Sequence, residues 1–215
     1  MLIIGAKGFA KEVLEILGQL DDLNNVVFYD DVTPSLPETM FGRFPILNNI
    51  SAAQYFLQNT DPRFTIGTGN PALRKKLYAK FSDIGGQFSS TISPRASVGK
   101  FGNTVEDGCN IMTGSVVTAD IKLSKGCLLN LNCTIGHDTV LGDFVELSPG
   151  VNVSGNCKIG NYSLLGTNAI LIPHVTLGEN VIVGAGAVVT KDVPDNSLVV
   201  GMPAKIIKQL EPLSF

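Results

Sequence analysis

Residues 105–194 read VEDGCN IMTGSV VTADIK LSKGCL LNLNCT IGHDTV LGDFVE LSPGVN VSGNCK IGNYSL LGTNAI LIPHVT LGENVI VGAGAV VTKDVP. Each of these fifteen six-residue units opens with Val, Ile or Leu, and the register holds without an insertion or a deletion. The fifth residue of each unit is small or β-branched, as at Cys109, Ser115 and Val145. Two inward-facing positions therefore recur every six residues, which is typical of a repeat architecture with a continuous core.

Glycine recurs in the second place of six units. These residues are Gly136, Gly142, Gly160, Gly166, Gly178 and Gly184. Because glycine accepts backbone conformations that a Cβ would deny, we expect these residues to supply the freedom that a corner needs. All four cysteines instead take fifth places, at Cys109, Cys127, Cys133 and Cys157. Since fifth places face inward, we interpret these thiols as small core residues rather than as nucleophiles, disulfides or zinc ligands.

The composition is that of a globular protein without a strong charge. The chain has 215 residues, of which 44% are hydrophobic and 16% are charged, and its formal net charge is −3. This balance argues against a nucleic-acid or an anionic-membrane partner. We interpret the one tight basic cluster, Arg74-Lys75-Lys76, as a solvated helix face. No apolar run approaches the roughly 20 residues of a membrane span, and the first residues lack the charged start of a secretory signal, so a cytoplasmic protein is expected.

Residues 1–88 follow a different pattern, in which strand and helix periods alternate. We expect strands at residues 1–4, 26–29 and 64–66, and helices over residues 9–20 and 71–84. Alternating strands and helices predict a small parallel sheet whose ligands bind beyond the carboxyl ends of the strands. The sequence therefore divides into an N-terminal domain of residues 1–88 and a repeat domain of residues 89–215.

Glycines and aspartates follow the expected strands of the N-terminal domain. The segment Gly5-Ala6-Lys7-Gly8 joins the first strand to the first helix, Asp30-Asp31 follows the second strand, and Gly67-Thr68-Gly69-Asn70 follows the later one. The first segment holds only part of the dinucleotide-binding fingerprint, and by itself it indicates no more than a tight turn. Its place before a helix, with two aspartates where a ribose-binding acid would lie, makes a nucleotide site the alternative.

The six-residue units, which end in Gly201-Met202-Pro203-Ala204-Lys205, resemble those of the hexapeptide-repeat acyltransferases. With the glycine loops and the stretch Ile66-Gly67-x-Gly69-Asn70-x-x-x-Arg74, the whole chain is similar to the sugar acetyltransferases of the bacillosamine and related 4-amino-sugar pathways and to the sialic acid O-acetyltransferases. The resemblance implies a small Rossmann-like parallel α/β domain followed by a left-handed parallel β-helix. It also implies a homotrimer.

The resemblance implies acetyl-CoA as co-substrate, a nucleotide-linked 4-amino-4,6-dideoxy sugar as acceptor, and no metal. The implied reaction is direct transfer of the acetyl group to the 4-amino group, with a histidine as general base. A sugar O-acetyltransferase of the sialic acid type and a non-catalytic trimeric nucleotide-binding scaffold are the alternatives. A zinc carbonic anhydrase on the same helix needs three histidine ligands, and this chain has two histidines.

The general base of the family matches His137, the third residue of its unit, where side chains leave the core. In that family three units make one coil, so residues 18 apart lie on adjacent strands, and Gly155 is expected beside His137. The resemblance implies that Asp138 orients the imidazole, that Gly155 offers its N–H to the thioester carbonyl, and that Asn130 belongs to the site. An acidic turn residue at Asp138 and an ordinary corner glycine at Gly155 are the alternatives, and we interpret His174 as a solvated corner residue.

The resemblance also implies which residues hold the two substrates. The acetyl-CoA positions are Glu146, Gly155, Thr167 and Ala185. Glu146 stands where the bacillosamine enzyme has a histidine, so a cationic contact with acetyl-CoA is lost there. The nucleotide-sugar positions are Gly5, Lys7, Gly8, Phe9, Asp30, Asp31, Gly69 and Asn70. The first loop is expected near the phosphates or the sugar and the two aspartates near the ribose or the base, unless both aspartates only cap a turn.

Overall fold

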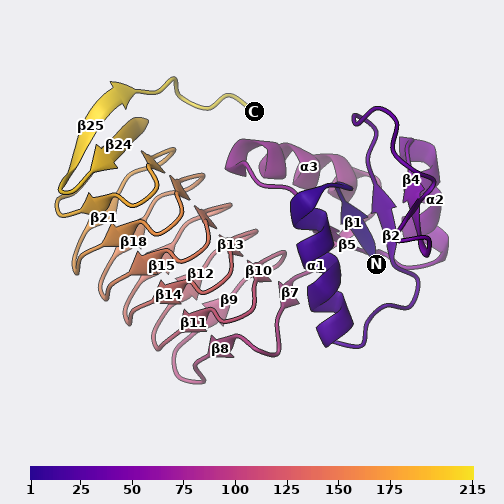
Figure 1. The fold of residues 1–215 in the computed structure, drawn as a ribbon, viewed down its shortest axis with the longest axis horizontal. Helices are drawn as coiled ribbons and strands as arrows, with labels where there is room; N and C mark the ends of the chain where they lie inside the picture. The colour runs from indigo at the N-terminus through magenta and orange to yellow at the C-terminus, as the bar shows by residue number, and fades with distance from the viewer.

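The structure, a computed structural model, describes residues 1–215 as two units that lie side by side (Figure 1). The N-terminal unit is an α/β sandwich, and the C-terminal unit is a stack of short strands. None of its helices has the length and the apolar character that crossing a membrane would require.

One six-stranded sheet forms the centre of the N-terminal unit. The elements of this unit are β1 (Leu2–Ile4), α1 (Gly8–Gln19), β2 (Val27–Tyr29), β3 (Thr39–Met40), β4 (Phe44–Leu47), α2 (Ile50–Asn59), β5 (Arg63–Ile66), α3 (Pro71–Asp83) and β6 (Gln87–Phe88). The strand order is β3-β4-β2-β1-β5-β6, and every pair is parallel except β3 with β4. The parallel sheet is thus confirmed, whereas the β3–β4 hairpin and α2 were not predicted.

Both faces of this sheet are buried under helices. Successive residues of β1 point to opposite faces, so Ile3 packs with Ala10 and Leu17 of α1, and Ile4 packs with Phe81 of α3 on the other face. β2 and β5 lie on the two sides of β1. The connection from β1 to α1 and the connection from β5 to α3 therefore run to opposite faces of the sheet. A doubly wound sheet opens a ligand crevice between two such connections, at the carboxyl ends of its strands.

The repeat unit is a left-handed parallel β-helix with three sheets. Its two-residue strands are β7 (Thr91–Ile92), β8 (Ser97–Val98), β9 (Thr104–Val105), β10 (Asn110–Ile111), β11 (Val116–Val117), β12 (Lys122–Leu123), β13 (Leu128–Leu129), β14 (Thr134–Ile135), β15 (Val140–Leu141), β16 (Glu146–Leu147), β17 (Asn152–Val153), β18 (Lys158–Ile159), β19 (Leu164–Leu165), β20 (Ile170–Leu171), β21 (Thr176–Leu177), β22 (Ile182–Val183) and β23 (Val188–Val189). Pairs such as Leu129 with Leu147 join residues 18 apart, which confirms the expected register.

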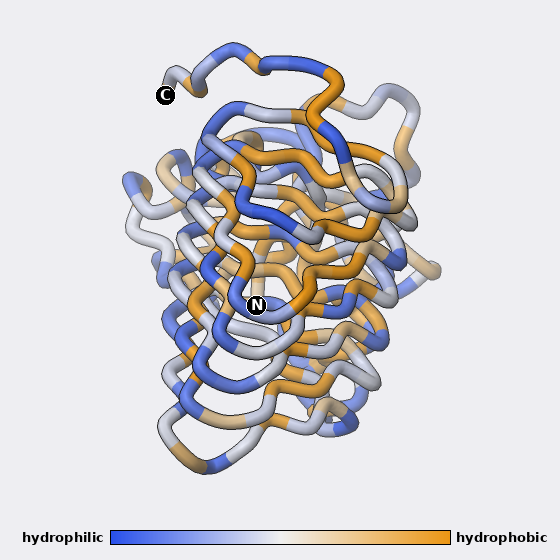
Figure 2. Tube along the Cα trace, turned by 90° about the vertical axis from the view of Figure 1, so that its left-hand side faces the viewer, coloured by the Kyte–Doolittle hydropathy of each residue, from blue (hydrophilic) through white to orange (hydrophobic).

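The first and fifth residues of the units fill the interior of the β-helix. Ile135, Val145 and Leu147 are fully buried in one continuous core, and Figure 2 shows hydrophobic residues recurring on successive coils. The four cysteines are free and lie in the same core. Burial raises the pKa of the Cys133 thiol to about 11, so this thiol stays protonated near neutral pH.

The corners use glycine for a different reason from the one expected. The fourth residue of each unit, from Gly108 to Gly186, has a positive φ. Even the bulky residues Phe144 and Tyr162 have a positive φ at this place. The second-place glycines do not have a positive φ. A Cβ on Gly136 would instead lie 2.5 Å from the backbone nitrogen of the next coil. The prediction of backbone freedom at these glycines was wrong, because what they permit is the close approach of two coils.

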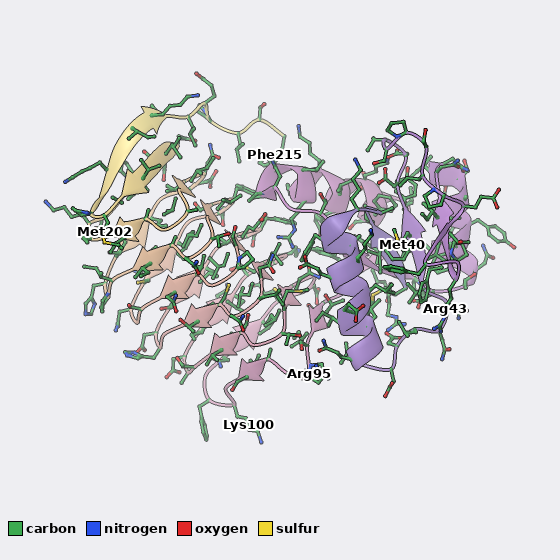
Figure 3. All side chains as sticks on the ribbon, viewed as in Figure 1. Met40, Arg43, Arg95, Lys100, Met202 and Phe215 are labelled. Atoms are coloured by element: carbon green, nitrogen blue, oxygen red, sulfur yellow. The ribbon has the colours of Figure 1, made fainter.

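The chain leaves the β-helix through a hairpin and then turns back. β24 (Ser197–Gly201) pairs with β22, and β25 (Ala204–Gln209) pairs antiparallel with β24. The last residues run back toward α3, so that Phe215 lies near this helix while Met202 lies at the far end of the stack (Figure 3). The ring of Phe215 lies 4.9 Å from that of Tyr162. The tail therefore covers the upper coils on the side that faces the N-terminal unit.

The two units meet along the sheet that contains β7, β10, β13 and β16. Ile16 of α1 packs on Met112 and Leu128 of this sheet. Arg74 of α3 is also fully buried, with 0% of its surface exposed. The interpretation of the basic cluster as a solvated helix face was therefore wrong for Arg74, whose side chain enters the junction between the units. Lys76 of the same cluster is exposed.

Candidate active site

A histidine and an aspartate lie in contact at one corner of the β-helix. His137 and Asp138 follow β14, and Nδ1 of the imidazole is 2.7 Å from Oδ2 of the carboxylate. In the neutral tautomer that donates from Nδ1 to Asp138, Nε2 carries no hydrogen and can accept a proton. The two side chains are 63% and 55% exposed, so a reactant can reach them. The pair has the chemistry of an oriented general base.

The imidazole of His137 lies over Gly155, one coil further on. A Cβ added to Gly155 would lie 2.8 Å from both Cε1 and Nε2 of the ring. The carbonyl of His137 accepts a hydrogen bond from the N–H of Asn156 at 2.8 Å. The expected adjacency of His137 and Gly155 is confirmed by these contacts. The N–H of Gly155 donates to no group within the chain, so it is free to meet a ligand beside the imidazole.

Asn130 of the expected catalytic set and Thr167 and Ala185 of the expected acetyl-CoA site lie at a different corner. Asn130 follows β13, at the corner before the strand that leads to His137, and its side-chain oxygen accepts from the N–H of Leu131 at 2.7 Å. Thr167 and Ala185 continue that corner one coil apart, since a Cβ on Gly166, the residue before Thr167, would lie 2.7 Å from the Ala185 nitrogen. Within one chain, β14 therefore separates His137 from Asn130, Thr167 and Ala185.

Glu146 lies at neither of these corners but at the junction of the two units. Its Oε2 accepts a hydrogen bond of 2.9 Å from the backbone N–H of Asn70. Burial raises the pKa of the Glu146 carboxyl, and the nearby Arg74 guanidinium opposes this shift. Thus the structure joins Glu146 to Asn70 in the expected nucleotide-sugar site, and not to Thr167 or Ala185 in the expected acetyl-CoA site.

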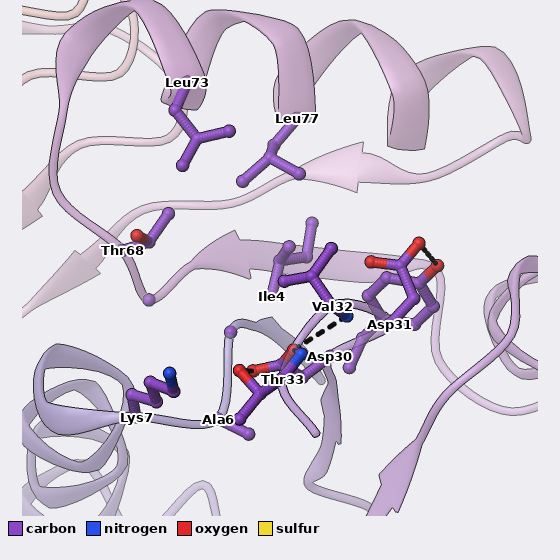
Figure 4. Close-up of a pocket in the computed structure, with 13 residues that line it drawn as sticks. Ile4, Ala6, Lys7, Asp30, Asp31, Val32, Thr33, Thr68, Leu73 and Leu77 are labelled. Atoms are coloured by element: carbon purple, nitrogen blue, oxygen red, sulfur yellow. Dashed lines mark hydrogen bonds between the residues drawn. The ribbon is translucent and has the colours of Figure 1, made fainter.

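A cavity of about 250 Å³ lies at the carboxyl edge of the N-terminal sheet. Of the expected nucleotide-sugar residues, Gly5, Lys7, Asp30 and Asp31 line it. Figure 4 shows Lys7 at one end and Asp31 at the other. Gly8, Phe9, Gly69 and Asn70 lie next to the lining without being part of it. The cavity coincides with the crevice that the strand order predicts.

Asp30 uses its carboxylate to hold the loop after β2. One oxygen accepts from the N–H groups of Val32 (3.2 Å) and Thr33 (2.9 Å), and the other accepts from the Thr33 hydroxyl at 3.0 Å. The side chain is also buried, because only 8% of the residue is exposed. This is the geometry of a turn-capping aspartate, so Asp30 shapes the cavity from within its wall.

Asp31 has a more open place in the same wall. Its Oδ2 accepts from the Tyr29 hydroxyl at 2.7 Å and from Lys80 Nζ at 2.8 Å. The hydrogen bond from Lys80 holds the pKa of Asp31 below its ordinary value, against the effect of burial. Asp31 is therefore an ionised acceptor at one end of the cavity.

Several lining residues were not predicted. They are Ile4, Ala6, Tyr29, Val32, Thr33, Gly67, Thr68, Leu73 and Leu77. Leu73 and Leu77 point from α3 toward Ile4 and Val32 (Figure 4) and make two apolar walls. The signal in the sequence was the spacing of four residues between Leu73 and Leu77. This spacing places both on one face of the helix that starts just after the loop of residues 67–70.

A histidine oriented by an aspartate on a hexapeptide β-helix, in one chain with a crevice at the edge of a doubly wound sheet, has the parts of an acyltransferase. Residues 1–81 match the PglD N-terminal domain family, and residues 156–191 match the bacterial transferase hexapeptide family. The chain belongs to the hexapeptide-repeat sugar acetyltransferases, because solved members of this group align with it over nearly its whole length.

Three such structures have closely similar folds. Perosamine N-acetyltransferase from Caulobacter crescentus, solved with CoA and GDP-perosamine, is 31% identical over 96% of each chain, with a TM-score of 0.89. The acetyltransferase domain of PglB from Neisseria gonorrhoeae is 33% identical over 96% of this chain and 98% of its own, with a TM-score of 0.85. WeeI from Acinetobacter baumannii is 30% identical over the same shares, with a TM-score of 0.84.

A curated relative matches a much shorter stretch. A Schizosaccharomyces pombe protein, provisionally named an acetyltransferase, is 63% identical over 30 residues, which are 14% of this chain and 14% of its own length. This chain therefore spans about a seventh of that relative, and the short match adds nothing on the acceptor.

Proposed function

We propose that this protein transfers the acetyl group of acetyl-CoA to the 4-amino group of a nucleotide-linked 4-amino-4,6-dideoxy sugar. The observation that carries the proposal is the pairing of His137 with Asp138 at 2.7 Å, with the imidazole beside Gly155, whose N–H has no acceptor in the chain. A relative aligned over 96% of the chain is a perosamine N-acetyltransferase solved with CoA and GDP-perosamine, which supports an amine on a nucleotide-linked sugar as the acceptor.

The proposed reaction is a direct transfer with one base. The amine nitrogen attacks the thioester carbonyl carbon, and Nε2 of His137 takes the proton that the nitrogen loses. The N–H of Gly155 donates to the oxyanion of the tetrahedral intermediate. The carbon–sulfur bond then breaks, and His137 returns its proton to the thiolate, which leaves the amide and CoA. The cysteines are buried in the core of the β-helix, so they offer no nucleophile for an acyl-enzyme.

The cavity of the N-terminal unit holds the nucleotide in this proposal. Lys7 and the first N–H groups of α1, at Gly8 and Phe9, suit a pyrophosphate, because a helix N-terminus attracts anions. Asp31 lies at the other end of the cavity, where an ionised carboxylate suits the hydroxyls of a ribose or the N–H groups of a base. The sugar then extends from the phosphates past Gly69 and Asn70.

We infer a homotrimer, in which neighbouring copies complete the site. His137 lies at one corner of the β-helix, and Asn130, Thr167 and Ala185 lie at another, so the corners of two adjacent copies would bring both sets together. A closed three-fold arrangement repeats this contact three times. A monomeric mass by light scattering, in a preparation that is fully active, would contradict the inference.

Thiol release tests the function directly. The purified protein is mixed with acetyl-CoA and with UDP-, dTDP- or GDP-linked 4-amino-6-deoxy sugars, or with free sialic acid. Rapid release with one amino sugar, and an N-acetylated product by mass spectrometry, would establish the proposed reaction and identify the acceptor. Release with sialic acid alone would assign the protein to O-acetylation, and binding of a nucleotide without any release would favour the non-catalytic scaffold.

Replacing Asp31 with asparagine is expected to raise KM for the nucleotide sugar by about tenfold, since a charge-assisted hydrogen bond to the substrate is lost. KM for acetyl-CoA and kcat are expected to stay within about twofold. Asp21→Asn is the matched control, because Asp21 is exposed and does not line the cavity. An unchanged KM for the nucleotide sugar in Asp31→Asn would exclude Asp31 from the binding site.

A further inference from the structure

Arg74 is a buried cation that has few partners. Its Nη2 donates to Asn110 Oδ1 at 3.3 Å, and its Nε and Nη1 have no hydrogen-bond partner in the chain. Asn110 in turn donates to the hydroxyls of Thr65 and Thr91, so both hydrogens of its amide group are used. The guanidinium is thus enclosed between α3, β5 and the strands β7 and β10. A fully buried charge needs a compensating charge nearby.

The carboxylate of Glu146 is the nearest acidic group that acts on the charge of Arg74. Burial lowers the pKa of Arg74 and raises that of Glu146, and each group opposes the shift of the other through its charge. The two side chains make no ion pair within 4.0 Å, since Glu146 appears in none of the ion pairs of the chain. Their attraction acts across the buried junction, where the effective dielectric constant is low.

The carboxylate of Glu146 is at the same time attached to the loop after β5. Its Oε2 accepts from the N–H of Asn70 at 2.9 Å, and a Cβ on Gly69 would lie only 3.1 Å from Oε1. Asn70 has a φ of +67°, and its side chain caps α3 by accepting from the N–H of Leu73 at 3.0 Å. Glu146 therefore holds a strained residue at the point where the loop becomes a helix.

This loop borders the proposed nucleotide-sugar site on two sides. Gly67 and Thr68, just before Gly69, line the cavity, and so does Leu73, the residue that Asn70 caps. A shift of Asn70 would thus move two parts of the lining, at Thr68 and at Leu73. Because Asn70 is held from the β-helix, the shape of the cavity depends on a residue of the other unit.

We propose that Glu146 is a positioning residue of the nucleotide-sugar site, which fixes the Gly69–Asn70 turn from the β-helix. The identity of the ligand in that cavity rests on the function proposed above. The proposal differs from the role first expected for Glu146, a contact with acetyl-CoA. The two roles are distinguishable, because they act on different substrates.

The test is a comparison of both KM values in two variants. Glu146→Ala removes the acceptor for Asn70 N–H and is expected to raise KM for the nucleotide sugar by about tenfold, with KM for acetyl-CoA within about twofold. Glu146→Gln keeps an amide oxygen as acceptor and is expected to cause a smaller rise. Glu106→Ala is the matched control, since Glu106 is a half-buried carboxylate of the β-helix that pairs with Lys122 and does not line the cavity. A rise in KM for acetyl-CoA alone, or no change in either KM, would overturn the proposal.

Hydrogen exchange gives a second readout that needs no turnover. The amide of Asn70 is expected to exchange about tenfold faster in Glu146→Ala than in the wild type, with the change confined to peptides that span residues 67–73. If Glu146→Ala does not fold, as judged by circular dichroism, Glu146→Gln decides by the same two KM values. A wild-type protein that turns over no nucleotide sugar would refute the proposed function, whereas unchanged exchange at Asn70 in a folded variant would refute the positioning role alone.

Discussion

Replacing His137 with alanine is expected to lower kcat by about 10² to 10⁴-fold, which is the usual contribution of a positioned general base. The substitution removes both the acceptor for the amine proton and the donor for the CoA thiolate. KM for the nucleotide sugar is expected to stay within about twofold, because the cavity at the edge of the N-terminal sheet does not include His137. The loss therefore falls on the chemical step and not on acceptor binding.

Steady-state thiol release with the accepted sugar measures this effect. His174→Ala is the matched control, because His174 is also an exposed histidine at a corner of the β-helix, and its φ of +67° resembles that of Asp138. We expect wild-type kcat in the control. A kcat within about threefold of wild type in His137→Ala would remove His137 from the mechanism.

A methyl group on Gly155 is expected to lower kcat by about 10 to 100-fold, because a displacement of about 1 Å at a reacting group costs this much. The added Cβ would lie 2.8 Å from Cε1 and Nε2 of His137. The ring is 63% exposed, so it can turn away from the methyl group without forcing the coils apart. Gly155→Ala is therefore expected to remain folded, with a thermal unfolding midpoint within a few degrees of wild type.

A double-mutant cycle separates the two ways in which Gly155 can act. If the methyl group works by displacing the imidazole, it has nothing to displace in the His137→Ala background, and the double variant has the kcat of His137→Ala alone. A further loss in the double variant would instead indicate that the N–H of Gly155 contributes by itself. Wild-type kcat in Gly155→Ala would contradict the close contact between the two residues.

The β-helix was predictable because its pattern is local and repeated. Each unit of six residues places its first and fifth side chains inward, and fifteen units in one register leave no other way to bury them. With the spacing of 18 residues from the family resemblance, the contact between His137 and Gly155 followed as well. The β3–β4 hairpin was missed because its first strand has two residues and Phe41 takes a positive φ, which its side chain does not signal.

The roles of single residues in the N-terminal unit were less accessible. Asp30 and Asp31 are identical in type and adjacent in the chain, yet Asp30 caps its own loop while Asp31 pairs with Lys80, 49 residues away. The sequence left a turn-capping role open for both. The two roles differ because the side chains of Asp30 and Asp31 point in different directions after β2. These directions depend on the packing of the loop.

By itself, the sequence determined the six-residue register of the β-helix and the parallel sheet of the first unit, because both follow from the spacing of apolar residues along the chain. Only the tertiary structure decided that Arg74 is buried and that Glu146 accepts a hydrogen bond from the N–H of Asn70. Asn70 and Glu146 are 76 residues apart and belong to different units. Their contact depends on how α3 docks on the outer face of the β-helix, and such a contact between two separately folded surfaces leaves no periodic signal in either segment.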